Sequence, residues 1–177
     1  ADDTQAGMGR TMSELALQNE EEQFSGLLPV LRFGEKEEPK VDSMLLFQND
    51  AQQGILHGTQ LGLALVAGGQ KNRMQVSFYH DGGYYHVETQ RLRLVKQASE
   101  GEDGLQLRLS LTGSTAVITK DGKPLYGQEA QAAEGLVNHF LSQEWEKLHR
   151  KTFLRGNDIC NLFFWLLQRD IPAAQAL

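Results

Sequence analysis

Met74 to Ile118 is the stretch that decides the fold, and it contains Leu105-Gln-Leu-Arg-Leu-Ser-Leu-Thr112. In this segment apolar and polar residues alternate without exception, so its four leucines share one face of an extended strand. Two further strands are predicted just before it, at Met74–His80 and Tyr84–Gln97. Three consecutive strands joined by short turns form an antiparallel meander.

The predicted connections between these strands contain the glycines that tight hairpin turns require. His80-Asp-Gly-Gly83 joins the first two strands, and Ser99-Glu-Gly-Glu-Asp-Gly104 joins the second pair. A third turn, Asp121-Gly-Lys-Pro124, is expected to close the region of strands.

The middle strand has an irregularity in its side-chain pattern. Tyr85 and Val87 share one face, whereas Leu92 and Leu94 would fall on the opposite face of a regular strand. One extra residue between Glu88 and Arg91 would bring the four side chains to the same face. The sequence therefore predicts a β-bulge at this point.

Upstream of the meander, the sequence predicts a mixture of short helices and extended segments. Thr11-Met-Ser-Glu14 fits a capping box and begins the first helix, and Thr59 is expected to cap the second, which Gly68-Gly69 would end. The expected elements are a helix at about 11–23, an extended segment at 27–33, strands at 41–47 and 54–57, and a helix at 60–67.

Downstream of the meander, the pattern changes to that of helices. From about Gln128 an amphipathic helix is predicted, whose apolar stripe comprises Leu136, Val137, Phe140, Leu141, Trp145 and Leu148. A second helical block is expected at Ile159–Gln168, stopped by Pro172, and it is apolar nearly all round at Leu162–Leu167. A helix of that composition is either enclosed by the fold or presents one face to a partner.

Strands followed by long helices indicate the α+β class. We expect an antiparallel β-meander sheet with helices segregated on one face, including the long C-terminal amphipathic helix.

The composition excludes several classes of function. A net charge of -6, without a cluster of Lys and Arg, argues against a nucleic-acid partner. The single cysteine, Cys160, excludes an internal disulfide and leaves too few thiols for a structural zinc site. Cys160 lies in an apolar run and is expected to be a buried, unreactive thiol. No apolar run reaches 18 residues, so the chain is expected to be soluble as given.

Catalytic, metal-binding and cofactor-binding residues are not predicted. Ser77, His80 and Asp81 lie close together, but no Gly-x-Ser-x-Gly motif surrounds the serine. Gly68-Gly-Gln-Lys71 lacks the spacing of a phosphate loop, and no two histidines show the spacing of a metal pair. A small hydrolase that uses the His80 region is kept as a rival hypothesis.

One group of residues could form a ligand surface. Tyr84, Tyr85 and His86 follow Gly82-Gly83 and would suit a small ligand, as in an extracytoplasmic ligand-binding module. Cross-strand packing of the aromatic rings is the alternative explanation for the same residues.

Two parts of the chain resemble the Ger(x)C family of spore-germination proteins. Pro39-Lys-Val-Asp-Ser-Met-Leu-Leu-Phe47, followed by Gly54-Ile-Leu-His-Gly-Thr-Gln-Leu-Gly-Leu63 and a glycine pair, is similar to the opening of that family's C-terminal domain. Residues 144–172, with Lys151-Thr152 and Asp158-Ile159, resemble its closing segment. Asn161-Leu-Phe-Phe-Trp165 departs from the family's Phe-Gly stretch.

The resemblance implies a division of the chain and a function. Residues 1–38 would be an N-terminal helix and lead-in segment, and residues 39–177 a Ger(x)C-like C-terminal α+β domain. The chain would then be a fragment of a lipoprotein that an acylated cysteine anchors to the outer face of the spore inner membrane. Such a protein is the non-catalytic C subunit of a nutrient germinant receptor, and it works beside integral-membrane A and B type subunits.

The mechanism implied by the resemblance is assembly. The apolar surface near Trp145, Phe163, Phe164 and Trp165 is the candidate partner-binding surface, and packing under the sheet is the simpler alternative for these residues.

Overall fold

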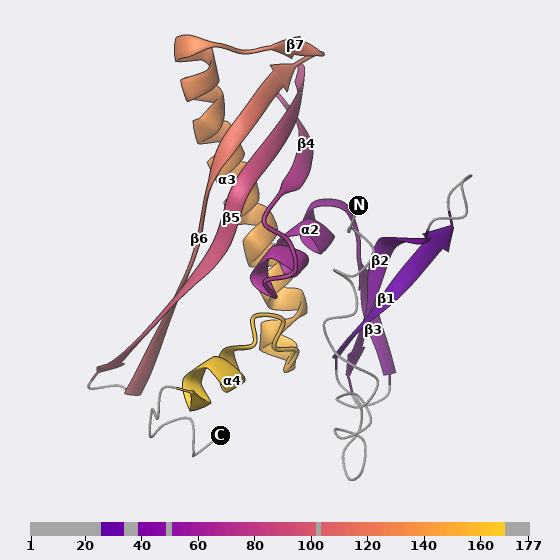
Figure 1. The fold of residues 1–177 in the computed structure, drawn as a ribbon, viewed down its shortest axis with the longest axis vertical. Coiled ribbons are helices and arrows are strands. Elements are labelled where there is room, and N and C mark those ends of the chain that lie inside the picture. Colours follow the sequence, from indigo (N-terminus) through magenta and orange to yellow (C-terminus); the bar gives the residue numbers. More distant parts are fainter. Residues whose placement is uncertain (1–25, 34–38, 49–50, 102–103, 169–177) are drawn as a thin grey trace.

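The computed structural model describes residues 26–33, 39–48, 51–101 and 104–168, whose strands form two antiparallel sheets (Figure 1). The first sheet contains β1 (Gly26–Phe33), β2 (Pro39–Gln48) and β3 (Ala51–Leu56). The second contains β4 (Met74–His80), β5 (Gly83–Gly101), β6 (Gly104–Lys120) and β7 (Lys123–Pro124). The helices are α2 (Gly58–Ala67), α3 (Gly127–Lys151), the 3₁₀ helix η1 (Phe153–Arg155) and α4 (Leu162–Leu167). The predicted α+β class is confirmed.

The second sheet is the predicted meander. Its β4–β5 turn has Asp81 at φ 43° and Gly82 at φ 74°, and its β6–β7 turn has Asp121 at φ 51° and Gly122 at φ 77°. Two consecutive positive φ values are the signature of the type I′ turn, whose twist suits a hairpin. The Asp-Gly pairs in the sequence thus mark both turns.

A bulge in β5 is confirmed, slightly later than the predicted interval of Glu88 to Arg91. The register shift between Glu88 and Thr89 places its extra residue on β6, between Thr115 and Val117. The extra residue of β5 lies in the second shift, between Gln90 and Arg93. Arg91 lies within this interval and has a positive φ of 56°. As a result, Val87 and Leu92, which are 0% and 7% exposed, both face the core.

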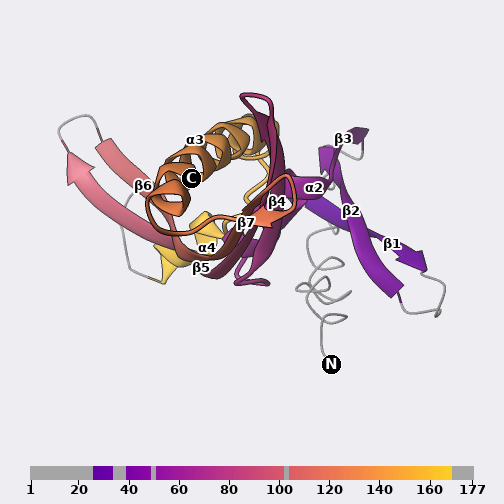
Figure 2. The ribbon, with the colours of Figure 1, turned by 90° about the horizontal axis from the view of Figure 1, so that it is seen from above.

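Helix α3 runs along one face of the meander sheet (Figure 2), and α2 contacts both β4 and α3. Met74 and Phe78 share one face of β4 because they are four residues apart on a strand. Met74 lies against Gly62 of α2, and the ring of Phe78 stacks on Phe140 of α3 with a centroid separation of 4.7 Å. The segregation of the helices on one face is therefore confirmed.

The apolar stripe of α3 faces this sheet. Val137 and Leu148 are 1% and 0% exposed, and the other four members of the predicted stripe are partly buried against the core. The helix begins at Gly127, where φ is +55°, and its last turn carries three basic residues that suit the negative end of the helix dipole.

A polar network joins α2 to α3. Glu144 accepts hydrogen bonds from Gln60 of α2 at 3.1 Å and from Lys147 at 2.6 Å, and Lys151 donates to Gln60 at 2.8 Å. Burial alone would raise the pKa of Glu144, but these hydrogen bonds and the charges of Lys147 and Lys151 outweigh it and lower the pKa.

Two helix starts differ from their predictions. Helix α2 begins at Gly58, so His57 and not Thr59 is the N-cap residue, and it makes no side-chain capping hydrogen bond. Helix α4 begins at Leu162 and not at Ile159, because Asn161 adopts a left-handed φ of 51° that a continuous helix does not allow.

The first sheet contains the extended segment that was expected at 27–33 and the strands that were expected at 41–47 and 54–57. Strand β1, from the predicted lead-in segment, pairs with β2, from the predicted C-terminal domain. The division between residues 38 and 39 stays a prediction. The helix predicted at about 11–23 and the stop at Pro172 lie outside the described residues.

Candidate functional site

Helix α4 exposes an apolar surface, which we call the α4 surface and define as Phe163, Phe164 and Leu167. These side chains are 49%, 63% and 41% exposed. The opposite side of the helix is anchored, since Leu162 and Leu166 are 3% and 2% exposed. The short helix therefore has one face in the core and one face available for contact with another molecule.

The loop before α4 fixes the position of this surface. Asp158 accepts a hydrogen bond at 2.9 Å from the backbone N–H of Phe163, an orphan donor of the first helical turn. The backbone carbonyl of Cys160 accepts a hydrogen bond from the ammonium group of Lys96 in β5. The first contact joins the loop to the start of α4, and the second holds the loop against β5.

Cys160 is buried in this loop, at 3% exposed. Burial, with the nearby charge of Asp158, raises the pKa of its thiol from 9.0 to about 12, and Lys96 opposes the change. The thiolate is therefore strongly disfavoured in the folded chain, in keeping with the predicted unreactive thiol.

The four predicted partner-binding residues do not form one surface. Phe163 and Phe164 belong to the α4 surface, and Trp165 is half-buried beside them in sequence. Trp145 lies on α3 and lines a groove of about 470 Å³ with Leu109 and Leu111 of β6, and no residue of α4 lines that groove. Because Trp145 is partly buried against the core, the packing explanation fits it better than a docking role.

The predicted ligand surface at Tyr84, Tyr85 and His86 is split by the strand geometry. Tyr85 is 6% exposed and its ring stacks on Phe78 at 5.2 Å, whereas Tyr84 is 53% exposed on the other face. The ammonium group of Lys120 lies 5.5 Å from the centre of the Tyr85 ring. Tyr85 therefore fits the alternative of cross-strand packing.

The histidines near the β4–β5 turn do not have the arrangement that the rival hypothesis of a hydrolase using the His80 region requires. The hydroxyl of Ser77 lies 2.9 Å from Nδ1 of His86, its register partner on β5, and not beside His80. His80 instead lies 3.4 Å from Asp81. Among the described residues no carboxylate is hydrogen-bonded to His86, so the Ser-His pair lacks the group that orients a catalytic histidine.

The contact between Ser77 and His86 was not predicted from the sequence. The two residues are nine positions apart in the sequence, and the meander register alone brings them together. Counting back from the Asp81-Gly82 turn would have predicted their pairing.

Comparison with solved structures gives one similar protein. The crystal structure of the GerBC protein superimposes with a TM-score of 0.66 and 13% sequence identity, and the match covers 90% of this chain. The chain has the GerBC fold. It spans about half of the GerBC chain, at 50% coverage. The Ger(x)C-like fold implied by the sequence resemblance is thereby confirmed.

Sequence comparisons add no further relative. No family model matches the chain, and no curated protein matches it. At 13% identity the GerBC match rests on the arrangement of the backbone. The match therefore supports the same fold for this chain. The roles of individual residues must be inferred from their own contacts.

Within the described residues, no helix is both long enough and apolar enough to cross a membrane. Helix α3 is long, at 25 residues, but its exposed face is charged.

Proposed function

We propose that this chain is part of a non-catalytic subunit of a nutrient germinant receptor in spore germination. The observation that carries the proposal is the GerBC fold, which matches 90% of the chain, together with the independent resemblance of two sequence segments to the Ger(x)C family. In this role the whole protein is a lipoprotein on the outer face of the spore inner membrane.

The partners in this proposal are the integral-membrane A and B type subunits, and the α4 surface is the docking site. Exposed phenylalanines on a rigid support suit such a contact, because aromatic side chains supply large apolar area to an interface. The loop contacts of Asp158 and Cys160 hold this surface in place before binding, which limits the entropic cost of association.

Co-purification with the A and B type subunits in detergent tests the proposal. The double variant Phe163→Ser/Phe164→Ser is expected to weaken binding by at least about 30-fold, the effect of losing an interface hot spot. Because both side chains are about half exposed or more, the variant should retain its unfolding midpoint.

The matched control is Tyr79→Ser/Tyr126→Ser, which removes two aromatic side chains that are 71% and 75% exposed and lie outside α4. It should bind the membrane subunits like the unaltered chain. Equal binding by both double variants would contradict the docking role of α4, and failure of the unaltered chain to bind would contradict the proposed function.

A further inference from the structure

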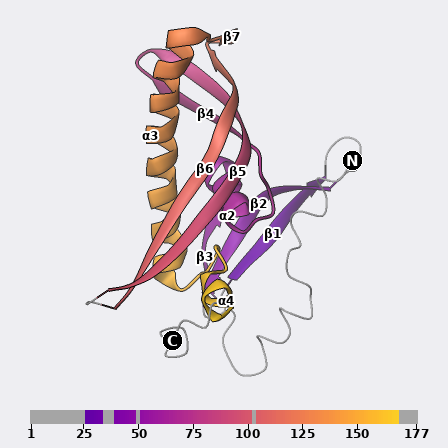
Figure 3. The same ribbon diagram turned by 60° about the vertical axis from the view of Figure 1, so that its left-hand side comes forward.

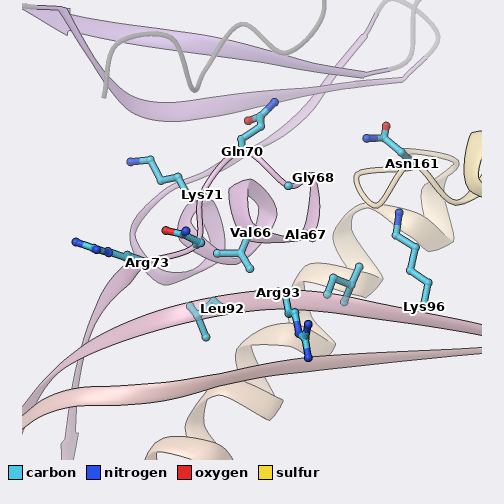
Figure 4. Close-up of a pocket in the computed structure, with 13 residues that line it drawn as sticks. Val66, Ala67, Gly68, Gln70, Lys71, Arg73, Leu92, Arg93, Lys96 and Asn161 are labelled. Carbon is cyan, nitrogen blue, oxygen red and sulfur yellow. The ribbon is translucent and has the colours of Figure 1, made fainter. Parts of the chain in front are cut away.

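A second concave site lies between the loop that follows α2 and strand β5 (Figure 4). Its volume is about 690 Å³, within the usual range for small-molecule sites. The walls are formed by residues 66–73, by residues 92–94 and 96 of β5 and by Asn161, which precedes α4. The site is separate from the α4 surface, because none of Phe163, Phe164 and Leu167 lines it.

The loop that forms one wall is well fixed. The backbone N–H groups of Gly68 and Gly69 donate to carbonyls of the last helical turn of α2, and Gly69 has a φ of 75°. On the other side, the carbonyl of Asn72 accepts a hydrogen bond from the backbone N–H of Leu92 at 2.9 Å. The loop is thus tied to both α2 and β5, so the site is largely formed before any ligand binds.

All the charged side chains that line the site are positive. Four cationic side chains line the site, and no Asp or Glu does, although the chain carries a net charge of -6. The cations are Lys71, Arg73, Arg93 and Lys96. Among the described residues, none of the four forms an ion pair. Four like charges around one concavity repel one another, and an anion would relieve that repulsion.

The cations differ in their availability. Figure 4 shows Lys71 and Arg73 extending from the loop at one end of the site, and Lys96 near Asn161 at the other. Lys96 already donates to the carbonyl of Cys160, and Arg93 donates to the hydroxyl of Thr112 at 3.3 Å. Lys71 and Arg73 make no side-chain hydrogen bond within the described part of the chain, so they are the principal anion-binding groups.

The lining also has an apolar part, which consists of Val66 and Ala67 of α2 and of Leu92 and Leu94 of β5. Leu94 is half-buried, whereas the other three side chains are nearly buried. A bare inorganic anion would leave this apolar surface in contact with water, whereas a ligand with a short hydrocarbon part would cover it.

We propose that this site binds a small organic anion, whose carboxylate or phosphate group is held by Lys71 and Arg73 and whose apolar part lies against Leu92 and Leu94. The proposal goes beyond the role in receptor assembly and does not depend on it, because it concerns the chain alone. A free small molecule is favoured over a membrane surface because these cations line a concavity.

Calorimetric titration of the chain with hexyl phosphate, hexanoate and hexylammonium tests the proposal. At low ionic strength the two anions should bind and the cation of equal chain length should not. Inorganic phosphate should bind at least about tenfold more weakly than hexyl phosphate, since it lacks the apolar part. Added salt should weaken the binding of both organic anions.

The variant Lys71→Gln/Arg73→Gln should lower the affinity for the organic anions by at least about tenfold. Lys71 is half-buried and Arg73 is exposed, so the variant is expected to fold. The control Arg108→Gln/Lys123→Gln removes the same charge from exposed positions outside the site and should bind like the unaltered chain.

Three results would overturn the proposal. They are equal binding of hexylammonium, equal affinity of the two charge variants, and binding of phosphatidylglycerol vesicles without any binding of hexyl phosphate. This experiment does not measure receptor assembly. Its outcome therefore neither supports nor contradicts the docking role of α4, which the co-purification experiment tests.

Discussion

The two halves of the long β5–β6 hairpin have different surroundings, although one continuous pair of strands forms both. In the half before the bulge, Val87 and Ile118 are 0% and 5% exposed. In the half beyond it, no described side chain of residues 93–99 or 104–112 is fully buried, and Leu107 is 37% exposed. Figure 3 shows this outer half extending past α3.

The difference shows that alternation predicts a strand but not how deeply the strand is buried. The most regular leucine pattern of the chain, residues 105–112, lies in the outer half. The inner half is buried because β4, α2 and α3 cover it, and a two-stranded ribbon without such cover is only marginally stable.

The largest expected effect compares one leucine from each half. Leu92→Ala should lower the free energy of unfolding by about 2–5 kcal/mol, because it empties a nearly buried site. Leu107→Ala should lower it by less than about 1 kcal/mol, since that side chain is already partly in water. Urea unfolding measures both values, and equal losses would contradict the difference between the halves.

A glycine at the bulge sharpens the comparison. A Cβ atom at Gly113 would collide with the side chain of Leu92 and lie 3.2 Å from the carbonyl oxygen of Gln90. Gly113→Ala should therefore lower the free energy of unfolding by about 1–3 kcal/mol.

The control for that change is Gly135→Ala on α3, where a Cβ atom would meet no other atom within 4 Å. This variant should raise the free energy of unfolding by about 0.5–1 kcal/mol, because alanine favours the helix. A stabilising effect at Gly113 would show that the bulge is not closely packed.

A further expected effect depends on pH and concerns the loop that Lys96 ties to the outer half. The folded pKa of Cys160, about 12, lies above its ordinary value of 9.0, so the unfolded chain loses the thiol proton first as pH rises. The free energy of unfolding of the unaltered chain, relative to Cys160→Ala, should be constant below pH 9.0 and fall between pH 9.0 and about 12.

The same burial should slow alkylation of Cys160 by iodoacetamide in the native state compared with the chain in urea. Rapid alkylation under native conditions, or a pH-independent difference from Cys160→Ala, would show that the loop opens readily.

Much of the fold could be predicted from local patterns. The Asp-Gly turns, the bulge and the stripe of α3 depend on neighbouring residues. The turns and the stripe were found where the sequence indicated them, and the bulge slightly later in β5. The early start of α2 and the late start of α4 could not be predicted, because they follow from unusual backbone conformations at Gly58 and Asn161.

The candidate sites were less predictable. Phe163 and Trp145 look alike in the sequence, yet one is on an exposed helix face and the other lines a groove against β6. The cations of the organic-anion site come from positions 71–73 and 93–96, which only the contact between the α2 loop and β5 brings together. Such long-range contacts leave no local pattern.

Site-specific photo-crosslinking tests the central claim, docking through α4, most directly. A photoreactive p-benzoylphenylalanine in place of Phe164, in the chain assembled with its receptor, should cross-link to an integral-membrane subunit. The same group in place of Tyr126, which is 75% exposed, should not. Cross-links from position 126 and none from position 164 would contradict the account.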